Sequence, residues 1–109
     1  QNFKQSVIDA KDGQTQLTLK EITPVRLIKN GFYEQVQEAY KRNASVQEIS
    51  NLLGRGRAKK GMHLGDLEEG ELEIGQISAY INELKPAADI VNEMMVEFKQ
   101  TIQTLNSQF

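Results

Sequence analysis

Six of the eight glycines lie between residues 54 and 75, and this clustering constrains the fold more than any other feature of the sequence. A glycine inside a helix costs about 1 kcal/mol relative to alanine, so a regular element through this stretch is disfavoured. We therefore expect residues 54–75 to form a long loop or a set of short turns, with helices and strands on either side.

Hydrophobic periodicity predicts a helix and one or two short strands at the start of the chain. Residues 2–11 have helical spacing. Residues 15–22 alternate, which places Leu17 and Leu19 on one face of a strand and the polar residues around them on the other. A second extended segment is predicted at 25–28.

Helical spacing returns after a turn signal at Asn30-Gly31. One apolar face predicts a helix that ends at Arg42; its members are Phe32, Val36, Ala39 and Tyr40. Ser45 and Glu48 have the spacing of a capping box, which predicts a second, short helix that begins there. The next glycine, Gly54, is a natural end for that helix.

Two further helices are predicted after Gly75. The first is marked by the apolar residues Ile77, Tyr80, Ile81 and Leu84. The second starts near Pro86, which suits the first turn of a helix. It carries the best amphipathic stripe in the chain, formed by Ile90, Val91, Met94, Phe98, Ile102 and Leu105. Together these elements predict a mainly α protein with one or two short strands, an α+β arrangement.

The composition excludes several classes of function. The absence of cysteine excludes disulfides and thiolate chemistry, and the single His63 cannot build a multi-histidine metal site. The net charge of −2 gives no overall field that attracts nucleic acid or an anionic membrane. No apolar run approaches the roughly 20 residues that span a bilayer. We expect a cytoplasmic protein without a metal, nucleic acid or membrane partner, and the first residue, Gln1, indicates a processed or excised chain.

Two charged clusters in the glycine-rich stretch are candidates for chemistry. The basic cluster consists of Arg55, Arg57, Lys59 and Lys60. It suits either a contact with a phosphate-bearing partner, such as an acidic carrier protein, or a solvated loop. The acidic cluster consists of Asp66, Glu68, Glu69, Glu71 and Glu73. Its carboxylates suit either acid–base chemistry and cation binding or a solvated face.

Gly75 and Gln76 are a candidate cofactor contact. A glycine at a helix start leaves backbone N–H groups beside the positive end of the helix dipole, and the Gln76 amide can donate to a carbonyl or ring nitrogen. An ordinary glycine N-cap is the alternative. The chain has no GxGxxG, GxxxxGK[ST] or HExxH motif, and we predict no catalytic residue in it.

The glycine-rich stretch also carries a resemblance to a known family. Residues 54–62 (GRGRAKKGM) and 65–76 (GDLEEGELEIGQ) resemble the C-terminal signature of the nitronate monooxygenase family, which includes the FMN-dependent enoyl-acyl-carrier-protein reductases. Residues 2–4, 24–30 and 85–91 are similar to the same family in the same order. The pair His63-Leu64 departs from the aromatic-acidic pair expected there, and His63 does not match the catalytic histidine of the family.

The resemblance implies a parent enzyme built on an FMN-binding TIM barrel, (β/α)8, most of which lies outside this chain. Residues 1–14 would be the helix after the last barrel strand, and residues 15–74 a small cap region with the glycine-rich loop. Residues 75–109 would be closing helices that pack back on the barrel. The phosphate-binding glycines and the catalytic histidine would lie in the missing part, and Gly75 and Gln76 would lie nearest the flavin.

The implied reaction is hydride transfer from NAD(P)H to FMN and then to an enoyl thioester. In the monooxygenase branch, the flavin would react with oxygen and a nitronate instead. The implied partners are the rest of the barrel polypeptide, acyl carrier protein and a second copy in a homo-oligomer. We expect the isolated chain to bind no cofactor and to be inactive. The residues alone also suit a stand-alone helical interaction or dimerisation module, or a carrier-protein or CoA-binding module that uses the loop from Arg55 to Lys60.

Overall fold

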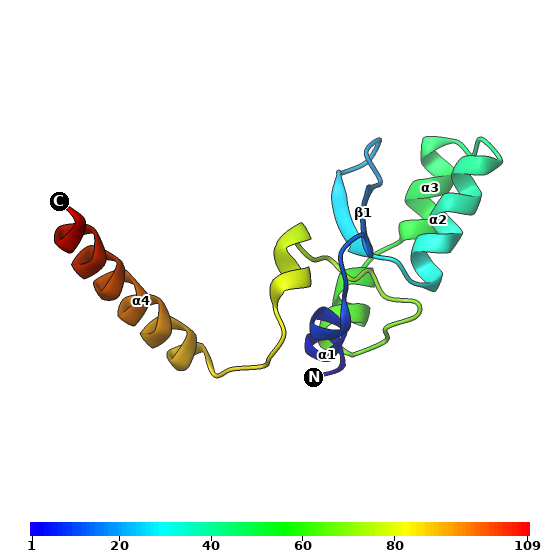
Figure 1. Cartoon of the computed structure of the whole chain (residues 1–109). Helices are drawn as coiled ribbons and strands as arrows, with labels where there is room; N and C mark the ends of the chain where they lie inside the picture. Colours follow the sequence, from blue (N-terminus) through cyan, green and yellow to red (C-terminus); the bar gives the residue numbers. More distant parts are fainter.

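Two short strands lie at the centre of the first part of the molecule (Figure 1). The computed structural model describes all residues, 1–109. Strands β1 (Thr15–Thr18) and β2 (Val25–Ile28) pair antiparallel. A single bridge between Leu27 and Glu73 adds a third extended segment to β2, so the end of the glycine-rich stretch lies against this strand.

Two helices pack beside the strands and confirm the predicted helical pair. Helix α2 (Gly31–Lys41) begins after Asn30, whose side-chain oxygen accepts a hydrogen bond from the Tyr33 backbone N–H. Helix α3 (Val46–Leu53) begins with the predicted capping box and ends at Gly54, which has a φ of 63°. The core is formed by Leu19, Leu27, Phe32, Val36, Ala39 and Ile49.

The first strand is shorter than its alternating pattern predicted. It stops at Thr18 because Leu19 has a φ of 55° and the chain turns there. The turn sends Leu19 into the core, where it is 1% exposed, whereas Leu17 is 38% exposed. Thr18, predicted on the outer face, is buried. The prediction that Leu17 and Leu19 share one face was therefore wrong.

Helix α1 (Asn2–Asp9) packs against two short helical turns from far along the chain. One is the π-type turn η1 (Lys59–His63), and the other is the 3₁₀ turn η2 (Gln76–Tyr80). Within residues 54–75, Arg57 and Ala58 begin a short helical stretch that continues as η1. The other residues of the stretch form turns and loop, as the glycine clustering predicted.

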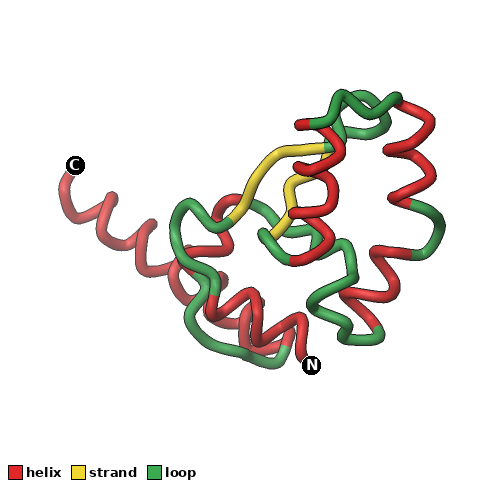
Figure 2. The backbone as a smooth tube through the Cα atoms, turned by 90° about the vertical axis from the view of Figure 1, so that its right-hand side faces the viewer, coloured by secondary structure: helices red, strands yellow, loops and turns green.

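The last helix, α4 (Ala87–Gln108), leads away from the rest of the chain in the views of Figure 1 and Figure 2. It confirms the predicted amphipathic helix, but none of its residues is buried. The other predicted C-terminal helix is reduced to η2, and Ile77 and Tyr80 are 69% and 80% exposed. Because these apolar side chains are mostly exposed, little tertiary packing supports a longer helix.

The molecule is thus mainly helical with two antiparallel strands, which confirms the predicted fold class. No helix in it combines the length and the apolar character needed to cross a lipid bilayer.

Candidate functional site

The segment Asp66–Gly70, in the middle of the glycine-rich stretch, has hydrogen bonds to every one of its backbone carbonyls. The Asn30 side-chain amide donates to the Leu67 and Gly70 carbonyls, at 2.8 Å each. The Phe32 backbone N–H donates to Glu68, the Arg57 guanidinium donates to Glu69, and the Gly70 N–H donates to Asp66. Segment Asp66–Gly70 is therefore attached firmly to the start of α2.

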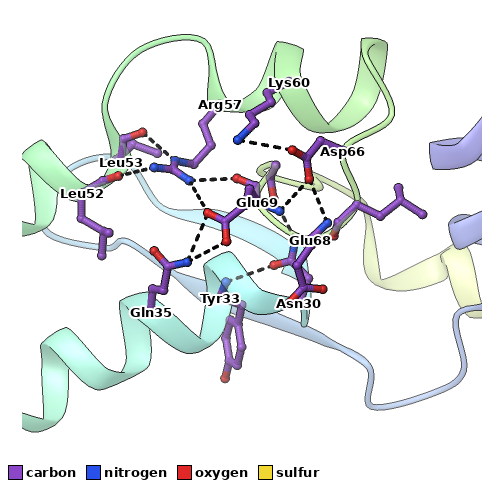
Figure 3. Close-up of polar contacts among 12 residues, drawn as sticks. Asn30, Tyr33, Gln35, Leu52, Leu53, Arg57, Lys60, Asp66, Glu68 and Glu69 are labelled. Carbon is purple, nitrogen blue, oxygen red and sulfur yellow. Dashed lines mark hydrogen bonds and ion pairs between the residues drawn. The ribbon is translucent and has the colours of Figure 1, made fainter.

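Arg57, one of the four basic candidates, points into the molecule rather than toward solvent. Its guanidinium donates to the carbonyls of Leu52 and Leu53 at 2.8 and 2.9 Å, and to that of Glu69 at 2.8 Å (Figure 3). It also lies 4.4 Å from the centroid of the Phe32 ring. These contacts engage each of its three nitrogens, so Arg57 binds backbone carbonyls within the chain.

The other three basic candidates lie on the surface. Arg55 and Lys59 are exposed and take part in no ion pair within the chain. Lys60 forms an ion pair with Asp66 at 3.3 Å. His63 is exposed at the end of η1. The structure thus divides the basic cluster, and only Arg55 and Lys59 present unpaired cations to solvent.

The acidic cluster is divided in a similar way. Asp66 accepts hydrogen bonds from the backbone N–H groups of Glu68 and Glu69 at 3.2 and 2.9 Å. The hydrogen bond from the Glu69 N–H, with a smaller contribution from Lys60, lowers the pKa of Asp66. Glu71 is buried, and desolvation raises the pKa of its carboxyl, with repulsion from Glu73 adding to the effect. The Glu69 carboxylate in turn accepts hydrogen bonds from the Gln35 amide at 3.1 and 3.2 Å. Asp66 and Glu69 are therefore both bonded to other parts of the chain.

Gly75 and Gln76 follow directly after the segment that pairs with β2. The Ile28 N–H donates to the Leu72 carbonyl at 3.0 Å, and the Ile74 N–H donates to the Arg26 carbonyl at 3.1 Å. Gln76 is exposed. Its side chain makes no hydrogen bond within the chain, so its amide is free to bind an outside group.

The backbone at this position also leaves space. A Cβ added to Gly75 would meet only the Cγ2 atom of Ile77, at 3.9 Å. The turn that follows, η2, is only five residues long, so its dipole is shorter than that of the helix predicted here. None of the surface cavities in the chain is lined by Gly75 or Gln76. The candidate cofactor contact is therefore an open edge and not an enclosed pocket.

The sequence did not indicate the importance of two polar residues. One caps a helix, and the other has a buried hydroxyl without a hydrogen-bond partner. Asn30 was interpreted only as part of a turn signal, although asparagine is also among the best N-cap residues, and that preference was the available signal. Ser78, in η2, is 4% exposed, and its hydroxyl has no hydrogen-bond partner in the chain. No sequence signal marked Ser78.

The fold is similar to the C-terminal part of enzymes of the nitronate monooxygenase family, which confirms the resemblance seen in the sequence motifs. A solved structure of FabK from Thermotoga maritima matches 99% of this chain with a TM-score of 0.82 and 27% sequence identity. A mutant of the same FabK matches 99% of the chain with a TM-score of 0.76 and 26% identity. The match covers 34% of FabK, so the chain spans about a third of its length. No family model and no curated protein matches the sequence.

Proposed function

We propose that residues 1–109 form the cap region and closing helices of a longer FMN-dependent oxidoreductase, most simply an enoyl-acyl-carrier-protein reductase. The observation that carries this proposal is the similarity to FabK, an FMN-dependent enoyl-acyl-carrier-protein reductase, over 99% of the chain. In this proposal residues 1–14 follow the last barrel strand, residues 15–74 form the cap, and residues 75–109 close the barrel.

The uncovered apolar surface supports the proposed position beside a barrel. The side chains of Ile90, Met94, Phe98 and Ile102 follow one another along α4, and all are exposed. Exposed apolar stripes of this length are uncommon on proteins that act alone, and they mark contact surfaces. The rest of the barrel polypeptide would cover them.

Gly75 and Gln76 fit a contact with the flavin. The space at Gly75 allows a ring edge to approach the backbone, and the unbonded amide of Gln76 can donate to a ring nitrogen or carbonyl. When bound, FMN would supply the hydride-transfer chemistry between NAD(P)H and an enoyl thioester. The residues of this chain would orient the ring, and we assign no proton transfer to any of them.

For the carrier protein, we propose a contact through Arg55 and Lys59, the two unpaired cations of the loop. Binding of an acidic carrier there should weaken with salt, and substitution of both residues by alanine should weaken it further. A homo-oligomer and a cytoplasmic location also belong to this proposal. Nitronate oxidation is the second reaction that the same fold would support, and turnover of a nitronate without NAD(P)H would favour it.

An intact-mass measurement and a flavin absorbance spectrum on freshly expressed material test the proposal. We expect a yellow species about three times the 12.3 kDa of this chain, with FMN bound and NAD(P)H oxidation. The isolated 109-residue chain should be colourless and inactive. Flavin-dependent turnover by the isolated chain would contradict the proposal.

A helical interaction module is the second candidate, and the exposure of α4 favours it. In that case a colourless 12.3 kDa protein would be made from its own start codon. It would be monodisperse, would unfold cooperatively and would show no dependence on flavin.

A further inference from the structure

The Asn30 side chain connects the start of α2 to two carbonyls of the segment Asp66–Gly70. Its Oδ1 accepts a hydrogen bond from the Tyr33 N–H at 3.0 Å and so caps α2. Its Nδ2 donates to the Leu67 and Gly70 carbonyls, at 2.8 Å each. Both hydrogens of the amide and its oxygen are therefore used. They connect the start of α2 to both ends of the turn Leu67–Gly70.

Downstream of Gly70, the chain has little freedom before it reaches Gln76. The Leu72 carbonyl and the Ile74 N–H bond to β2, and Gln76 comes two residues after Ile74. β2 ends at Ile28, shortly before Asn30, so the same stretch of chain holds this segment at Gly70 and again at Leu72 and Ile74. A change in the position of Gly70 should therefore weaken the hydrogen bonds that Leu72 and Ile74 form with β2.

We infer that Asn30 is a positioning residue that sets the path of residues 70–74 along β2 and, through it, the place of the Gln76 amide. This inference rests on the proposed function only for the role of Gln76. The geometric part, from Asn30 to Ile74, stands on the hydrogen bonds of this chain alone.

The substitution Asn30→Asp separates the two functions of this side chain. Aspartate is as good an N-cap as asparagine, so α2 should remain capped. The carboxylate cannot donate, so it faces the Leu67 and Gly70 carbonyls with like partial charge and both hydrogen bonds are lost. Asn51→Asp is the matched control, because it makes the same charge change on the exposed surface of α3, where the only hydrogen bond of the Asn51 side chain is with Gln47.

Hydrogen exchange on the 109-residue chain tests the geometric part. We expect the Ile74 amide to exchange about 10-fold faster in Asn30→Asp, because loss of two hydrogen bonds loosens the segment. Amides within α2 and those of Asn51→Asp should keep their rates. An unchanged rate at Ile74 would overturn the inference, whatever the flavin result.

A double-mutant cycle in the longer FMN-binding polypeptide tests the link to Gln76. We expect Asn30→Asp and Gln76→Ala each to weaken FMN binding about 10-fold, and the double variant to be no weaker than about the stronger single one. Additive losses, or no loss in Asn30→Asp, would contradict the link. An unchanged affinity in Gln76→Ala alone would instead remove Gln76 from the proposed flavin site and leave the exchange result to decide the geometry.

Discussion

Gly61 and Gly70 touch through their backbones. A Cβ added to Gly61 would lie 3.0 Å from the Cα of Gly70 and 2.7 Å from a methyl group of Leu72. A Cβ added to Gly70 would overlap the Gly61 backbone and lie 2.5 Å from the Asp66 carbonyl oxygen. This contact places η1 directly against Gly70. It requires glycine most strictly at Gly70, because every atom that the added Cβ would meet there belongs to the backbone.

We expect Gly70→Ala to lower the free energy of unfolding by about 3 kcal/mol, because the added methyl group meets backbone atoms that cannot give way. Gly56→Ala is the control: its φ is 75°, but nothing lies within 4 Å of the added Cβ. Backbone strain alone should cost it about 1 kcal/mol. Urea unfolding followed by circular dichroism measures both. Equal losses would show that the contact with Gly61 does not limit stability.

Gly75→Ala should behave differently in the short chain and in a flavin-bound parent. Gly75 has a φ of −74°, which alanine adopts without strain, and no atom of the chain crowds the added Cβ. The free energy of unfolding of the 109-residue chain should therefore change by less than about 0.5 kcal/mol. In the longer polypeptide, a methyl group between the backbone and the ring should weaken FMN binding about 10-fold. Fluorescence titration with FMN would exclude Gly75 from the site if affinity were unchanged.

Arg57→Met should destabilise the fold, whereas Arg55→Met should not. The first change removes donors from the Leu52, Leu53 and Glu69 carbonyls and the contact with the Phe32 ring. We expect it to cost about 3 kcal/mol, because three partly buried carbonyls lose their partner. Arg55 is exposed, and its substitution should change stability by less than about 0.5 kcal/mol. Thermal unfolding of the two variants side by side compares them, and similar melting temperatures would contradict the internal role of Arg57.

Stability should fall in acid as Asp66 becomes protonated. Hydrogen bonds to its carboxylate lower its pKa in the folded state below the ordinary value of 3.8, the largest coming from the Glu69 N–H. Stabilisation from this group is thus fully present above that ordinary value and is lost as the pH falls through the folded-state pKa. Asp66→Asn should be less stable at pH 7, and its stability should fall less between pH 5 and pH 2. Denaturant titrations at several pH values in that range measure the free energy of unfolding of both proteins. If that free energy fell equally with pH in the two proteins, Asp66 would not have this role.

The elements that could be predicted are those whose signals are local. The capping box of Ser45 and Glu48 acts within one helical turn, and the predicted helix forms there. The apolar spacing from Ile90 to Leu105 likewise predicts a helix, and α4 forms there. The glycine clustering correctly indicated turns, since glycine disfavours regular structure through its own backbone freedom.

The errors arose where distant segments meet. Leu17 and Leu19 alternate as a strand should, yet the turn at Leu19 buries one and exposes the other. The sequence also gave no sign that Arg57, a member of the basic run, lies over Phe32. Neither outcome is visible in neighbouring residues, because the partners lie in other elements.

By itself, then, the sequence determined most of the helices, the capping box of α3, the glycine-rich break and the family that its motifs resemble. The tertiary structure decided which charged and polar residues are used internally and which remain free. Asn30 and Arg57 find their partners only when the loop folds back on α2, whereas Gln76 keeps its amide unbonded at an open edge. The physical reason is range: propensities and caps act over a few residues, but a hydrogen bond between distant segments depends on how the whole chain closes.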